Sequence, residues 1–172
     1  AASAPDQGRS ALDGVEAMNY LVNLMREHIP QESRIHYVIT KGGEAPNIVP
    51  EIAQVYYYVR HPDKDRVVEL FDKVVNTANA AAMGTETKVE FEVMHGNYPV
   101  LPNYALSAVV DKNLRALGGI EYDQKESEFA QEIVKTFVMH KKALGSQEIV
   151  QPFQYRQSMG STDVGDVSWL VP

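Results

Sequence analysis

The sequence predicts a protein of the α/β class, of the α+β type, in which two helices cover one face of an antiparallel sheet. Two segments have the apolar spacing of amphipathic helices, and three others alternate apolar and polar residues as strands do. Their order along residues 1–98 is helix, strand, strand, helix, strand. A hydrophobic content of 44% with 23% charged residues is that of an ordinary globular protein.

The first helix is expected from Ser10 to about His28, because apolar residues recur there at steps of four and three and so share one face. Pro30 helps to end it. The second helix is expected to follow Asp63, its N-cap, and to end at Gly84. The predicted buried positions are Ala11, Val15, Met18, Val22, Met25 and Ile29 in the first helix, and Val67, Leu70, Phe71, Val74, Ala78 and Ala81 in the second.

Three strands are expected, at residues 34–40, 52–60 and 88–94, from the period-two alternation of their side chains. In the second strand one face carries Val55, Tyr57 and Val59, and the other carries Tyr56, Tyr58 and Arg60. The order corresponds to a ferredoxin-like β-α-β-β-α-β unit without its first strand. We expect that strand immediately before Ala1, because the chain has the character of the interior of a longer polypeptide.

Residues 99–172 differ in character, so a domain boundary is expected after residue 98. Helices are expected at residues 103–117 and 124–143. The apolar run at residues 167–171 predicts a short buried strand.

Composition excludes several classes of function. A net charge of −7 argues against a nucleic-acid partner, which would require a basic surface. No apolar run is long enough to cross a membrane. The absence of cysteine removes disulfides and thiolate metal sites and fits a cytoplasmic location.

The chain itself offers no set of metal ligands or nucleophilic residues. Its histidines are at least eight residues apart, with no Glu-Glu pair and no Gly-x-Ser-x-Gly. The five are His28, His36, His61, His95 and His140. We therefore predict no metal ligand and no catalytic residue within these 172 residues.

The candidate binding residues are Asn47 and Arg60. Asn47 lies in the Pro-flanked loop Gly42–Pro50, and Arg60 ends the strand that this loop precedes. An amide and a planar guanidinium are suitable donors for a carboxylate. Residue types alone leave a second interpretation open, in which Asn47 shapes a turn and Arg60 pairs with a neighbouring acid.

Three motifs carry a resemblance to a known family. They are Gly8-Arg9-Ser10-Ala11-Leu12-Asp13, the loop Gly42–Pro50 with the strand after it, and Ser158-Met159-Gly160-Ser161-Thr162-Asp163. In this order, and along almost the whole chain, they resemble the M20 metallopeptidase and amidohydrolase family. The resemblance implies that residues 1–98 are the lid, or dimerisation, domain and that residues 99–172 belong to the metal-dependent catalytic domain.

The resemblance also implies an activity. The intact enzyme would cleave the amide of N-acyl amino acids, with 4-aminobenzoyl-glutamate, a compound of folate catabolism, as the expected substrate. Divalent metal ions, zinc or manganese, would be held by ligands outside this chain, which alone would be inactive. Asn47 and Arg60 would bind the substrate carboxylate, with Thr40 and His61 as weaker candidates. A further set, expected to orient ligands or substrate beside the cleft, is Ser161, Thr162 and Asp163.

The partners implied by the resemblance are a second copy of the chain, bound through the lid domain, and a small N-acyl amino acid. A different polypeptide of the same hydrolase, acting as its second subunit, is a further candidate. One alternative of a different class stays open: a stand-alone ferredoxin-like module that binds an amino acid and dimerises without catalysis. That alternative leaves residues 99–172 unexplained.

Overall fold

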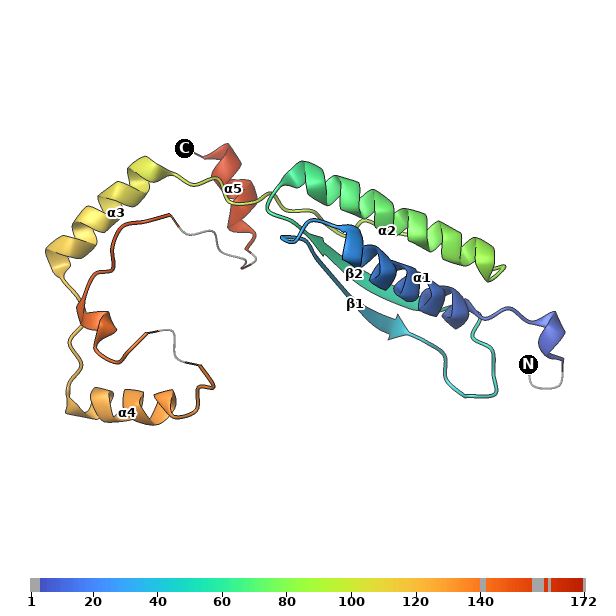
Figure 1. Ribbon diagram of the computed structural model, residues 1–172, viewed down its shortest axis with the longest axis horizontal. Helices are drawn as coiled ribbons and strands as arrows, with labels where there is room; N and C mark the ends of the chain where they lie inside the picture. Colours follow the sequence, from blue (N-terminus) through green and yellow to red (C-terminus); the bar gives the residue numbers. More distant parts are fainter. Residues whose placement is uncertain (1–3, 140–141, 156–159, 161, 172) are drawn as a thin grey trace. The chain divides into compact units, whose positions relative to one another are not determined.

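The computed structural model describes residues 4–139, 142–155, 160 and 162–171 (Figure 1). The chain divides into two compact units. The first comprises Ala1–Val100 with Asp163–Asp166, and the second comprises Leu101–Thr162 with Val167–Pro172.

The first unit has two helices on one face of a two-stranded antiparallel sheet, which confirms the predicted fold class (Figure 1). Its elements are η1 (Pro5–Gln7), α1 (Ala11–Met25), η2 (Arg26–His28), β1 (Arg34–Lys41), β2 (Gln54–Arg60) and α2 (Lys64–Gly84). The register pairs Arg34 with Arg60 at one end of the hairpin and Lys41 with Gln54 at the other. A bulge interrupts β1 between Ile39 and Lys41.

Both helices begin at residues whose side chains satisfy free backbone N–H groups. The Ser10 hydroxyl accepts from the Asp13 N–H at 3.3 Å. The Asp63 carboxylate accepts from the N–H groups of Asp65 and Arg66, at 2.8 and 3.2 Å. These two bonds lower the pKa of Asp63, since they stabilise its ionised form. The predicted start of each helix is therefore confirmed.

The core of the first unit joins both helices to the hairpin. Val22 of α1, which is 0% exposed, packs with Ile35 of β1 and Val74 of α2. The partly buried residues around them are Met18, Met25, Ile29, Tyr57 and Val59. Some residues of both predicted helix stripes and some inward residues of both strands thus meet in one cluster.

One polar contact lies beside this core. The Tyr57 hydroxyl on β2 donates to Oδ1 of Asn19, a buried residue of α1. Burial raises the pKa of the Tyr57 phenol far above its ordinary value, with the neighbouring Tyr37 adding to the effect, so the hydroxyl stays protonated. The ring of Tyr37 lies 5.3 Å from that of Tyr57, and the Arg26 guanidinium lies 5.7 Å from the Tyr37 ring centre.

The expected third strand, residues 88–94, is not formed. Within the part of the chain that the structure describes, the sheet contains only β1 and β2, and this segment is irregular. A strand requires hydrogen bonds to a neighbouring strand, which an alternating pattern cannot supply by itself. Phe91 is 62% exposed, although its ring still meets that of Phe71 on α2 at 6.1 Å.

The second unit contains α3 (Tyr104–Leu117), α4 (Gln124–Val134), η3 (Ser146–Glu148) and the C-terminal part of α5 (Val164–Leu170), whose first residues are grouped with the first unit. No residue of α3 or α4 is buried. Gly118 ends α3 with a φ of 84°, a left-handed conformation that glycine adopts without strain.

Two expectations for this unit are wrong. The helix expected at residues 124–143 ends at Val134, because Thr136 and Phe137 donate three residues back and close a tight turn. Residues 167–171, expected as a buried strand, lie in and just after α5 and are exposed or half-buried. A short apolar run does not distinguish strand from helix, and a helix satisfies its backbone internally, as the Val171 N–H does on the Val167 carbonyl at 3.0 Å.

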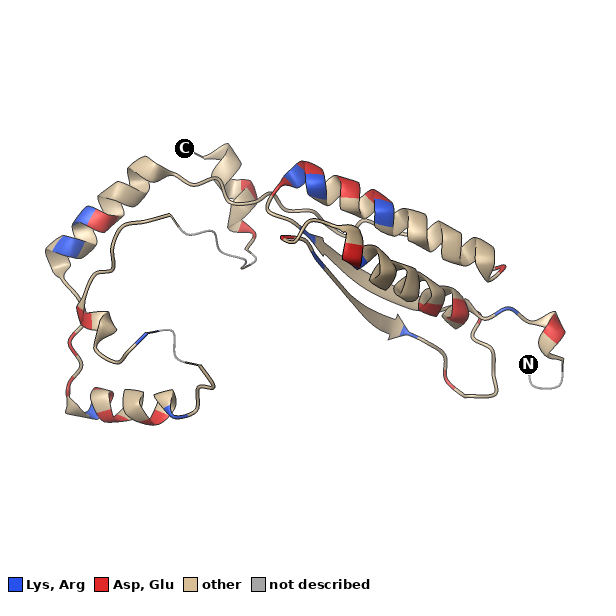
Figure 2. Ribbon diagram, in the orientation of Figure 1, with Lys and Arg blue, Asp and Glu red and all other residues tan. Residues whose placement is uncertain are grey.

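Charge is unevenly distributed along α2. Its first half carries Lys, Arg, Asp and Glu, whereas the half after Lys73 carries none (Figure 2). Glu69 accepts from Arg66 at 2.7 Å and from Lys73 at 2.8 Å, pairs that support an exposed helix surface. Among the described residues, no helix is long and apolar enough to span a membrane.

We predict that Tyr57→Phe lowers the free energy of unfolding by about 1–3 kcal/mol, because the buried Asn19 amide loses its partner. The double variant Tyr57→Phe with Asn19→Leu should recover most of this loss, since neither polar group remains. Urea unfolding measures both. Tyr20→Phe, on the exposed side of α1, is the control and should change stability by less than about 0.5 kcal/mol. An equal loss in the single and double variants would contradict the assignment.

Candidate functional site

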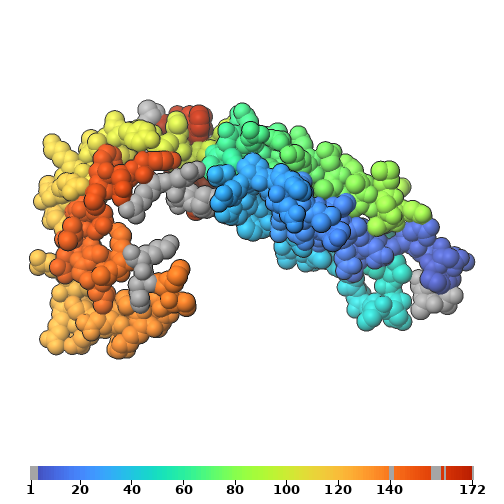
Figure 3. Space-filling view, in the orientation of Figure 1, coloured from blue at the N-terminus to red at the C-terminus, as the bar shows by residue number. Residues whose placement is uncertain are grey.

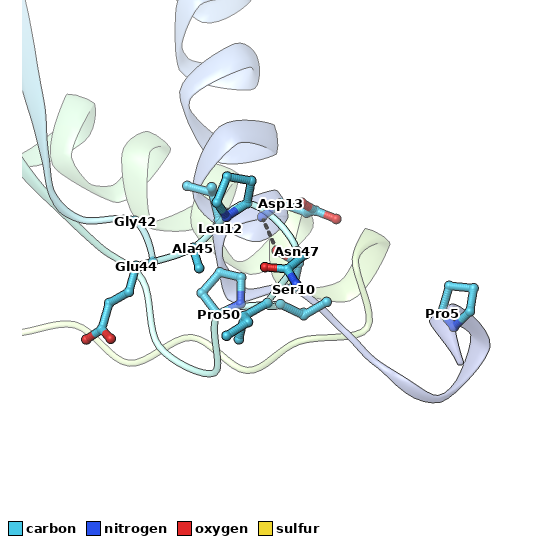
Figure 4. A pocket seen from close by; sticks show the side chains of 13 residues that line it. Pro5, Ser10, Leu12, Asp13, Gly42, Glu44, Ala45, Asn47 and Pro50 are labelled. Carbon is cyan, nitrogen blue, oxygen red and sulfur yellow. Dashed lines mark hydrogen bonds between the residues drawn. The ribbon is translucent and has the colours of Figure 1, made fainter. Parts of the chain in front are cut away.

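The loop between β1 and β2 folds against the start of α1, and together they line an open pocket of about 650 Å³ (Figure 4). The Ala11 N–H donates to the Pro50 carbonyl at 3.0 Å and so fixes the end of the loop to the helix. The lining residues include Asn47, together with Pro5, Ser10, Leu12, Asp13, Pro50 and the loop residues between Gly42 and Pro50.

Two features of the loop sequence set the position of Asn47. Gly43 has a φ of 111°, a conformation that favours glycine, and a side chain there would also come within 3.4 Å of Pro50. The Ile48 N–H donates to the Ala45 carbonyl at 3.1 Å and closes a turn around Asn47. Asn47 is consequently exposed at the pocket, close to Ser10 in the view of Figure 4.

The charges of this pocket do not by themselves favour an anion. Asp13 and Glu44 are among its lining residues, and none of the lining residues in the described structure is Lys, Arg or His. Asn47 therefore offers a neutral amide donor in an acidic setting. A carboxylate bound at Asn47 would require a cation from elsewhere.

Arg60 lies at the opposite end of the hairpin. It pairs with Arg34, whereas the loop that carries Asn47 joins the end at Lys41 and Gln54. The length of β2, about 20 Å at the usual rise of a strand, separates the two ends. The structure thus does not bring Asn47 and Arg60 together within one chain.

The neighbours of Arg60 on the outward face of the hairpin are basic and aromatic. Because Ile35 and Val59 face the helices, Arg34 and Arg60 lie on the outward face of the hairpin, followed by the pair His36 and Tyr58. The ring of Tyr58 lies 5.1 Å from that of Tyr56 on the same face. Sequence reasoning missed Arg34; counting outward from the two ends of the hairpin loop could have placed it opposite Arg60.

The two weaker candidates make local contacts. The Thr40 hydroxyl donates to the side-chain oxygen of Gln54 at 2.9 Å, across the loop end of the hairpin. His61 accepts at Nδ1 from the Asp63 N–H at 2.9 Å, just before α2. In its neutral form His61 therefore carries its proton on Nε2.

The candidates near the C-terminus lie around the start of α5. Ser161 is outside the described residues, and Thr162 and Asp163 are exposed. The carboxylate of Asp166 accepts from the Tyr98 N–H at 2.7 Å, so an acid near the start of α5 satisfies a backbone donor. Gly165 lies against the same residue, because a side chain there would come within 1.9 Å of the Tyr98 carbonyl oxygen.

No metal centre can be built from the described part of the chain. Within it, no three His, Asp or Glu side chains lie close enough together to hold a metal ion. The residues present therefore do not fit the metal that the resemblance implies. What the described residues offer is binding chemistry, namely an amide, guanidinium groups and aromatic rings.

Curated relatives cover the whole length of the chain. One of them, a component of the p-aminobenzoyl-glutamate hydrolase of Escherichia coli (strain K12), is 33% identical over 199 residues, which cover 100% of this chain and 41% of the relative. The Xaa-Arg dipeptidases of Mus musculus and Homo sapiens are 28% and 29% identical, over 100% and 99% of this chain. The chain spans 34% and 33% of their lengths, so it covers 33–41% of the length of these three relatives.

A family model also matches, over residues 1–86, half of the chain. It describes the peptidase dimerisation domain of the M20 family, and the matched segment contains α1, the hairpin and α2. The motifs in the sequence, the two helices on one face of the hairpin and the family model agree. This chain therefore belongs to the M20 family, and residues 1–86 form its peptidase dimerisation domain.

Proposed function

We propose that this chain supplies substrate binding and dimer contacts to an M20 amidohydrolase that cleaves N-acyl amino acids, with 4-aminobenzoyl-glutamate as the expected substrate. The relatives named above are a hydrolase of p-aminobenzoyl-glutamate and dipeptidases of Xaa-Arg. Aminobenzoyl-glutamate and a dipeptide both end in a free carboxylate next to the scissile amide. The observation that carries the proposal is the guanidinium pair on the outward face of the dimerisation domain.

Arg60 is assigned to the terminal carboxylate of the substrate. Its planar fork of donors matches a carboxylate, and the opposite guanidinium of Arg34 increases the positive potential there. A carboxylate held at this point would fix the adjacent amide for attack, which converts binding energy into orientation. Asn47 is assigned to the same substrate as a neutral donor.

A dimer that pairs through β1 would allow Asn47 and Arg60, which are far apart within one chain, to act on the same substrate. Within the described structure β1 pairs only with β2, so its other edge is open and can pair with a second copy. A two-fold axis makes such pairing antiparallel. The Asn47 loop of one protomer then lies beside the Arg34 and Arg60 end of its partner, about two strand spacings, or 10 Å, from Arg60.

The remaining roles belong to the longer hydrolase. Ser161, Thr162 and Asp163 are assigned to the border of the cleft, where hydroxyl and carboxylate groups can orient substrate. We further propose a divalent metal, zinc or manganese, with ligands outside this chain, since the described residues contain no suitable group. The metal would supply a Lewis acid to the reaction, and this chain would supply orientation.

We predict that Arg60→Ala, in the longer hydrolase, raises KM at least about tenfold for substrates with a free terminal carboxylate, because a charge-assisted hydrogen bond is worth about 1.5–3 kcal/mol. Substrates esterified at this carboxylate should be affected much less. Steady-state kinetics on matched acid and ester substrates tests this. Equal losses on both would show that Arg60 has a structural role only.

We predict a dimer that pairs through β1. The chain contains no cysteine, so single cysteines introduced at His36, Val38 or Thr40 report contacts across the two-fold axis without interference. Under mild oxidation at least one should form a disulfide-linked dimer, whereas Met83→Cys, an exposed position on α2, should not. Sedimentation of the unmodified protein should give a dimer. A monomer at high micromolar concentration would exclude the proposal.

We predict that the 172-residue chain alone does not hydrolyse 4-aminobenzoyl-glutamate in the presence of zinc or manganese. The reason is that its described residues contain no metal-binding group. Chromatographic detection of released 4-aminobenzoate, together with metal analysis after dialysis, measures this. Turnover with stoichiometric bound metal would contradict the prediction.

A further inference from the structure

Arg34 stands directly opposite Arg60 in the ladder of the hairpin. Side chains of directly opposite residues begin about 4.5–5.5 Å apart, and two like charges in this position destabilise the pairing. Both lie on the outward face, since their neighbours Ile35 and Val59 face the helices. The hairpin thus places two cationic residues opposite each other on one face, where an anion could accept from both side chains.

The Arg34 side chain is held in place while part of its donor set stays available. Its Nη1 group donates to the backbone carbonyls of Gln31 and Ser33, both at 2.7 Å, in the turn before β1. Among the described residues Arg34 has no ion pair, and its Nε and Nη2 groups have no hydrogen bond. A side chain already fixed by its own backbone loses little freedom when it binds a ligand.

We propose that Arg34 determines specificity by binding a second carboxylate, that of an acidic side chain at the C-terminal residue of the substrate. The inference rests on the proposed function, in which Arg60 holds the main-chain carboxylate. The two carboxylates of a glutamate residue are three carbon atoms apart, a span similar to the Cβ separation of directly opposite residues, from which two long arginine side chains extend. The pair of guanidinium groups can therefore hold both carboxylates of one glutamate.

The same pair discriminates against basic substrates. An arginine side chain in the position of the glutamate side chain would bring a third cation against Arg34 and Arg60. The curated relatives are named for substrates of both kinds, one for a glutamate compound and others for Xaa-Arg dipeptides. Arg34 therefore gives the enzyme a preference for substrates whose C-terminal residue is acidic.

The experiment compares three substrates with the same 4-aminobenzoyl group and a C-terminal glutamate, alanine or arginine, in the longer hydrolase. Arg34→Ala should lower kcat/KM for the glutamate substrate by about tenfold, leave the alanine substrate within about twofold, and not lower the value for arginine. Arg34→Lys should retain part of the preference, because it keeps the charge but not the fork. Lys88→Ala, which removes another exposed cation, is the control and should leave the preference unchanged.

A binding measurement separates failure of this inference from failure of the proposed function. Calorimetric titration with glutarate and with butyrate should show tighter binding of the dicarboxylate, and Arg34→Ala should abolish the difference. If the unmodified hydrolase cleaves none of the three substrates, the proposed function fails, and the glutarate titration alone decides the role of Arg34. An unchanged preference for dicarboxylates in Arg34→Ala, in the kinetics or in the titration, would overturn the inference.

Discussion

The packing of α1 and α2 on one face of the hairpin is the constraint on which the candidate site depends. Val22, Ile35 and Val74 meet in the core, and the bond from Tyr57 to Asn19 ties β2 to α1. Successive residues of a strand point to opposite faces, and a slip of one residue would exchange them all. The burial of Ile35 therefore places Arg34 on the outward face. The two helices form a continuous layer of side chains along this unit (Figure 3).

The elements of the first unit could be predicted because local signals agreed with tertiary packing. The apolar stripe of α1 and the N-cap Asp63 of α2 both mark helices. The backbone hydrogen bonds of a helix are made within the helix itself or by a cap a few residues away. Residues 88–94 and 167–171 could not be predicted in this way. An alternating or apolar pattern indicates which side chains favour burial. A strand also needs hydrogen bonds to a neighbouring strand, which the pattern does not reveal.

The candidate site was predictable in its residue types and not in its geometry. The sequence brings Asn47 close to Arg60 along the chain, but the antiparallel register carries the chain away from the loop before it reaches Arg60. The same register brings Arg34, distant in sequence, directly opposite Arg60. Asp13, which is distant from Asn47 in sequence, joins it at the pocket only because the loop is folded against α1.

The contacts of Tyr98 and Leu101 have a consequence for the chain between them and α5. The Tyr98 N–H is held by Asp166 at 2.7 Å and the Leu101 N–H by Ser168 at 2.8 Å, so the two ends of Leu101–Thr162 are fixed close to each other. Such a segment is a long connection whose two ends are joined by hydrogen bonds. The entropy of closing it grows only with the logarithm of its length. Insertions within Leu101–Thr162 should therefore lower the stability of the dimerisation domain little. A side chain at Gly165, in contrast, would collide with the Tyr98 carbonyl and disrupt the contacts that join the two ends.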